Sequence, residues 1–71
     1  MGDYHVEQKD GGWIVEQEGD RKSDRKLVER LANSEQAWLV ATFYARTGGV
    51  DAFLHDDHRG IKEERRFRER S

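Results

Sequence analysis

Residues 37–45 read A-W-L-V-A-T-F-Y-A and form the longest apolar run in the chain. Apolar residues are scarce elsewhere, because 39% of the 71 residues are charged. A small domain usually distributes such residues over several elements, so that each turns one face towards a shared core. Their concentration here predicts that this segment contacts more than its own core.

Length and composition favour one small cytoplasmic domain, residues 1–71, with a frayed tail at 67–71. A chain of this size buries only about 60% of its unfolded surface. It has no cysteine, which excludes disulfides and cysteine-based zinc sites and fits a reducing compartment. Met1–Gln8 lacks the features of a secretory signal. The apolar run is about half the roughly 20 residues that span a bilayer, so we expect no membrane partner.

The first part of the chain predicts strands. Tyr4–Lys9 alternates in polarity, Asp10-Gly11-Gly12 is typical of a tight turn, and Trp13–Gln17 alternates again. Together they predict a β-hairpin. Arg21–Leu31 fits either a third strand, which we favour, or the start of one long helix from Asp24 to Thr47.

The second part predicts a helix followed by two strands. Asn33 or Ser34 is a typical N-cap, the helix then continues to Thr47, and Gly48-Gly49 ends it. Val50–His55 and Ile61–Phe67 are expected to be strands joined by a hairpin loop at 56–60. The predicted order is β-β-β-α-β-β, an α+β domain with one helix packed on an antiparallel sheet.

The predicted helix has more apolar surface than one sheet needs. At about 100° per residue, the face expected to lie on the sheet is centred on Ala37, Val40, Ala41 and Tyr44. The whole apolar arc covers roughly 260°, whereas an ordinary surface helix shows little more than about 100°. The apolar helix residues that do not face the sheet either extend the core under neighbouring loops or form an exposed patch. The expected interface residues are Trp38, Leu39, Thr42, Phe43 and Arg46.

Several short motifs are spread along the chain: His5-Val6, Gly11-Gly12-Trp13-Ile14-Val15, Ala37, Ala41, Ala45, Gly48-Gly49, His55, Asp57, Gly60 and Ile61. Together they resemble the small prokaryotic family called domain of unknown function 2188. The resemblance implies the fold and no activity. The family usually alternates apolar and polar residues in its helix, so the apolar helix sets this chain apart.

Residues with catalytic or metal-binding potential form only weak patterns. His55 and His58 flank two aspartates and are weak metal candidates, but a polar hairpin loop explains them better. No nucleophile motif surrounds the serines, and the glycine pairs lack phosphate-loop spacing. We therefore expect no enzyme activity, no bound metal and no cofactor.

A basic C-terminal segment gives the chain an alternative function in nucleic-acid association. The whole chain has a net charge of −2, which argues against a general nucleic-acid binder. Acidic residues also interleave with the basic ones in the C-terminal segment. Exposed Tyr4 or Trp13 would offer a ring for base stacking. The residues for this alternative are Arg59, Lys62, Arg65, Arg66 and Arg68.

The favoured interpretation is a non-catalytic protein–protein interaction module that acts through the apolar helix face. Its partner would be a second copy, giving a homodimer, or another protein. The small size fits a phage-type regulator or inhibitor of a larger protein.

Overall fold

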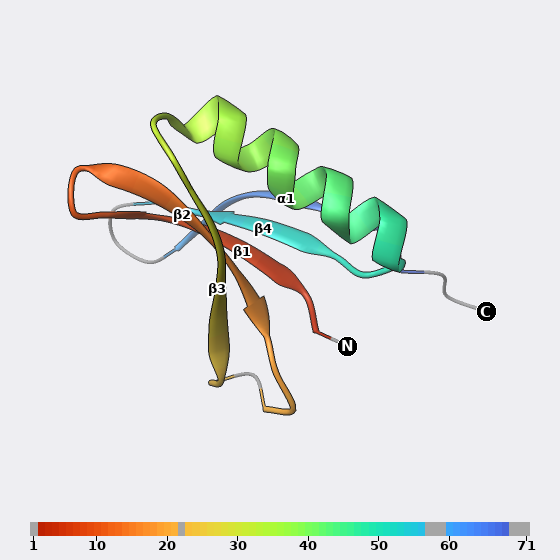
Figure 1. Cartoon of the computed structure of the whole chain (residues 1–71). Helices are drawn as coiled ribbons and strands as arrows, with labels where there is room; N and C mark the ends of the chain where they lie inside the picture. Colours follow the sequence, from red (N-terminus) through yellow and green to blue (C-terminus); the bar gives the residue numbers. More distant parts are fainter. Residues whose placement is uncertain (1, 22, 57–59, 69–71) are drawn as a thin grey trace.

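The computed structural model describes residues 2–21, 23–56 and 60–68. It confirms an α+β fold in which one helix packs on a five-stranded sheet (Figure 1). The elements are β1 (Tyr4–Lys9), β2 (Gly12–Glu18), β3 (Arg25–Leu31), α1 (Ser34–Gly48), β4 (Ala52–His55) and β5 (Ile61–Arg65). Arg25–Leu31 is thus a strand and not a helical extension.

The sheet is mixed, with strand order β3-β2-β1-β4-β5, so the prediction of a purely antiparallel sheet was wrong. β1 pairs with β4 in parallel, and the other pairs are antiparallel. The position of α1 between β3 and β4 explains the parallel pair. Two successive hairpins make β3 run in the direction of β1, and α1 then returns the chain to the end at which β1 starts. A strand that begins there and adds beside β1 must be parallel to it.

The β1–β2 hairpin follows directly from its turn. Asp10 and Gly11 have φ angles of 54° and 79°, the left-handed pair that a two-residue type I′ turn requires. This turn aligns Val6 with Val15. Both valines are fully buried on the side of the sheet that faces α1.

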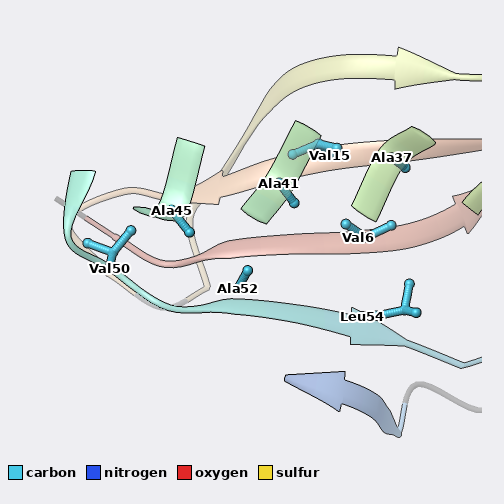
Figure 2. Close-up of a cluster of buried hydrophobic side chains, with 8 residues drawn as sticks. All are labelled: Val6, Val15, Ala37, Ala41, Ala45, Val50, Ala52 and Leu54. Carbon is cyan, nitrogen blue, oxygen red and sulfur yellow. The ribbon is translucent and has the colours of Figure 1, made fainter. Parts of the chain in front are cut away.

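A small core lies between α1 and the sheet (Figure 2). The helix contributes Ala37, Ala41 and Ala45, all with no exposed surface. Alanine on this face lets the helix backbone approach the sheet closely. The observed sheet-facing side is therefore rotated slightly about the helix axis from the predicted one. Ala45 belongs to the observed side, whereas Val40 is half-buried and Tyr44 remains 37% exposed.

The β2–β3 hairpin bends away from the body beyond a bulge. The register between these strands shifts at Val15/Glu16, and a bulge increases local bend and twist. In Figure 1 the end of this hairpin extends below the layer that α1 covers. Leu27 and Val28 on β3 are consequently exposed.

One helix leaves much of the sheet open. Strands lie about 4.8 Å apart and a helix with its side chains is about 10 Å wide, so α1 covers the width of roughly two strands. Its strongest packing is against β1 and β2. No helix in the described part of the chain is long and apolar enough to cross a membrane.

Candidate functional site

Local sequence fixes both ends of α1 and therefore the direction in which its side chains point. The Asn33 side-chain oxygen accepts a hydrogen bond from the Gln36 N–H at 2.9 Å, which caps the first turn. At the other end Gly49 adopts φ 68°, and its N–H donates to the carbonyls of Ala45 and Arg46. This is the left-handed C-cap for which glycine is preferred.

The surplus apolar residues of α1 divide into two groups. Trp38 is half-buried and packs against the core, so it extends the core as well as reaching the surface. Leu39 and Phe43 remain 69% and 57% exposed. Folding within the single chain therefore does not bury these two side chains.

A groove of about 520 Å³ lies beside these residues, between α1 and the C-terminal end of β5. We call it the α1 groove; its lining residues are Trp38, Leu39, Thr42, Phe43, Arg46, Arg65 and Phe67. The structure thus brings together all five residues that the sequence predicted as an interface. The sequence did not predict Phe67 as a site residue, and it assigned Arg65 only to the nucleic-acid alternative, because their place beside α1 depends on strand order, which local sequence does not encode.

The chemistry of the α1 groove is apolar with a positive edge. The Thr42 hydroxyl donates to the carbonyls of Trp38 and Leu39, at 2.9 and 3.1 Å, so it is satisfied within the helix. Neither Arg46 nor Arg65 forms an ion pair with another residue of the described ranges. A bound segment would meet aromatic and aliphatic side chains and two arginines.

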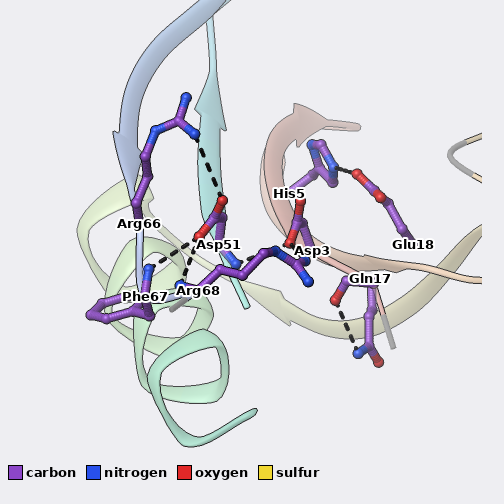
Figure 3. Close-up of polar contacts among 9 residues, drawn as sticks. Asp3, His5, Gln17, Glu18, Asp51, Arg66, Phe67 and Arg68 are labelled. Atoms are coloured by element: carbon purple, nitrogen blue, oxygen red, sulfur yellow. Dashed lines mark hydrogen bonds and ion pairs between the residues drawn. The ribbon is translucent and has the colours of Figure 1, made fainter. Parts of the chain in front are cut away.

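Phe67, which lines the α1 groove, is held in place by Asp51, the residue directly before β4 (Figure 3). The buried Asp51 carboxylate accepts hydrogen bonds from the backbone N–H groups of Phe67 and Arg68, both at 3.1 Å. The chain is therefore anchored through residue 68, beyond the start of the tail expected at 67–71. Residues 69–71 lie outside the described residues.

The basic residues proposed for nucleic-acid binding do not form one continuous surface. Arg66 lies 3.1 Å from Glu64 and 3.9 Å from Asp51, and Arg68 lies 2.5 Å from Asp3. Lys62 is exposed on β5, whereas Arg65 lines the α1 groove. Arg59 lies outside the described residues.

The aromatic rings considered for base stacking already have neighbours. Tyr4 stacks on Tyr44 with ring centroids 5.8 Å apart. Trp13 is half-buried against the core.

A second polar cluster occupies the sheet face opposite α1. His5 Nε2 lies 2.5 Å from a Glu18 oxygen, and His5 Nδ1 lies 2.7 Å from His55 Nε2. Phe53 stacks on the His5 ring with centroids 5.3 Å apart. Burial lowers the pKa of His5, although the hydrogen bond that His5 donates to the Glu18 carboxylate opposes this shift.

The weak metal prediction on His55 and His58 finds no support from the described residues. His55 uses its Nε2 atom on His5, and its buried Nδ1 atom has no partner within the described part of the chain. His58 lies outside that part. The ranges that the structure describes hold no group of three or more His, Cys, Asp or Glu residues arranged to bind a metal.

Comparison with known proteins adds no functional assignment. No family profile, curated protein sequence or solved structure matches the chain. The resemblance to domain of unknown function 2188 therefore stays a prediction.

Proposed function

We propose that the protein is a non-catalytic protein–protein interaction module that binds through the α1 groove. The observation that carries the proposal is the exposure of Leu39 and Phe43, at 69% and 57%, on the helix that also forms the core. Exposed apolar side chains that adjoin a groove are typical of protein-binding sites.

Fully burying a leucine or phenylalanine contributes about 1.5–3 kcal/mol relative to leaving it exposed. The single chain gains less than half of this contribution from Leu39 and Phe43, which are 69% and 57% exposed, so a partner that covers them would gain the remainder on binding. Trp38 and Phe67 add aromatic rings to the groove lining, and aromatic residues dominate the binding energy of many interfaces.

This function needs no chemical step and suits a small accessory protein of the cytoplasm, such as a phage-type regulator that inhibits a larger protein. Such a regulator would act by occupying a surface of its target. The absence of cysteine fits this compartment.

The test compares the proteins that bind the wild-type chain and the variants Leu39→Glu and Leu27→Glu in a cell lysate. Leu27 is also an exposed leucine, at 45%, but lies on β3 away from the α1 groove. It therefore controls for the general effect of replacing a surface leucine with an acid.

Quantitative mass spectrometry should find partners that wild type and Leu27→Glu retain and Leu39→Glu loses by about tenfold or more, the equivalent of about 1.4 kcal/mol. Circular dichroism should show that all three chains fold. If the three folded chains retain the same proteins in equal amounts and also self-associate equally, the α1 groove is not the binding site.

A further inference from the structure

The outer side of α1 carries a stripe with opposite charges at its two ends. The stripe consists of Glu35, Leu39, Thr42 and Arg46, spaced by four, three and four residues. This spacing places them on one side of a helix. Glu35 lies in the first turn and Arg46 in the last, with the exposed Leu39 between them.

Such a stripe is complementary to itself when turned end to end. If two α1 helices lie antiparallel, Glu35 of each chain faces Arg46 of the other, and Leu39 of each faces Thr42 of the other. The positive N-terminal end of each helix then also lies beside the negative C-terminal end of its neighbour. A parallel arrangement would instead place like charges together.

We propose that the α1 groove binds a second copy of this chain, with the two α1 helices packed antiparallel about a twofold axis. This inference rests on the proposed function and names the partner. A twofold interface uses the same surface on both subunits, so each contact occurs twice. Leu39 and Phe43 of each chain would enter the groove of the other.

Charge favours a second copy over an unrelated chain as the occupant. Neither end of the stripe is neutralised within the described part of the monomer, because Glu35 and Arg46 form no ion pair there. A purely acidic partner would satisfy Arg46 and Arg65 but would repel Glu35. Only a surface that presents a base opposite Glu35 and an acid opposite Arg46 satisfies both, and this chain has that surface.

The dimer should be weak. The 15 residues of α1 extend about 22 Å at about 1.5 Å per residue. A standard interface buries about 800 Å² on each partner, which is more than one side of such a helix offers alone. We therefore expect association at micromolar concentrations and above.

The test is sedimentation velocity over a concentration series from about 5 µM to about 1 mM, which brackets the expected dissociation constant. Arg46→Glu and Glu35→Arg should each weaken the wild-type dimer by about tenfold or more, because each places two like-charged pairs across the axis. Mixed together, the two variants should form a heterodimer. The double variant, in which both charges are exchanged, should recover most of the wild-type affinity.

Exchanging these charges also opposes the helix dipole, and the mixture of the two single variants controls for this effect. The mixture contains both altered helix ends, but each charge pair across the axis is again between opposite charges. A mixture that associates as weakly as the single variants would show that pairing across the axis does not hold the dimer.

A monomeric wild type throughout the series, or a double variant as weak as the single variants, would overturn the antiparallel dimer. The proposed function is tested separately. If wild type is monomeric but Leu39→Glu still loses partners from the lysate, the dimer fails and the interaction module stands. If Leu39→Glu loses neither self-association nor any partner, both proposals fail.

Discussion

His5 is a buried titratable residue that links stability to pH. It is only 6% exposed, lies between Glu18 and His55, and has Arg25 nearby. Burial lowers its pKa below the ordinary value of 6.5, so the unfolded chain takes up a proton first as pH falls. The contribution of His5 to stability is therefore fully present above about pH 6.5 and decreases as pH falls towards the folded-state pKa.

Urea unfolding at a series of pH values between about 4.5 and 7.5 checks this expectation, since this window lies around the ordinary pKa of histidine. The free energy of unfolding should decrease below about pH 6.5 in wild type and decrease less in His5→Gln, which cannot titrate. Equal pH dependence in the two chains would show that His5 is not the group responsible.

Sequence reasoning placed His55 in a hairpin with His58 because those residues are close along the chain. The structure does pair His55 with Ile61 in that hairpin, but the His55 side chain contacts His5 on the neighbouring parallel strand. The residue types alone indicated that His55 can titrate. Its contact with His5 could not be predicted, because that contact depends on which strand lies beside β1.

At the scale of the element, the two glycines at the end of α1 have opposite requirements. Gly49 has φ 68°, and a Cβ there would meet no atom within 4 Å, so any cost of Gly49→Ala is conformational. Gly48 is the last helical residue, and a Cβ there would lie 4.0 Å from Val50 Cγ2, an ordinary contact.

We expect Gly49→Ala to lower the free energy of unfolding by about 1 kcal/mol, because alanine is strained at positive φ. Gly48→Ala should raise it by up to about 1 kcal/mol, because alanine favours helix. Thermal unfolding of both variants checks the pair. Two shifts of the same sign would contradict this assignment of the C-cap.

Elements with strong local signals were predictable. The bounds of β1, the turn at Asp10-Gly11, the N-cap Asn33 and the helix end at Gly49 all follow from residues next to them. The outer side of α1 was predictable for the same reason, since helical periodicity determines which side chains oppose the buried alanines. The half-buried position of Trp38 was not, because it depends on packing against the sheet.

For the whole molecule, strand order was the part that the sequence did not reveal. Hairpin turns dictate which consecutive strands pair, but no local signal states where a strand joins after a helix. This gap explains the wrong antiparallel assignment and the two missed groove residues, Arg65 and Phe67.

Asp51 ties the two ends of the described chain to the sheet. Its carboxylate accepts from the Phe67 and Arg68 N–H groups, and its own N–H donates to Asp3 at 3.0 Å. Asp51→Ala should lower the free energy of unfolding by about 2 kcal/mol, because two backbone donors lose their acceptor.

Urea unfolding is again the measurement, with Asp51→Asn as the control that keeps an acceptor oxygen. The Asn variant should lose clearly less stability than the Ala variant. An Ala variant as stable as wild type would show that these hydrogen bonds do not anchor the C-terminal segment.

The parallel pairing of β1 with β4 has a consequence for synthesis in the cell. Asp3 and Asp51, which meet where these strands begin, are 48 positions apart. During synthesis β1 is therefore made well before β4, the strand with which it pairs in parallel. Contacts so distant in sequence slow folding. A nascent chain in which β1 has paired with β2 therefore exposes the outer edge of β1 until β4 has been made, and only then does β4 shield that edge from other chains.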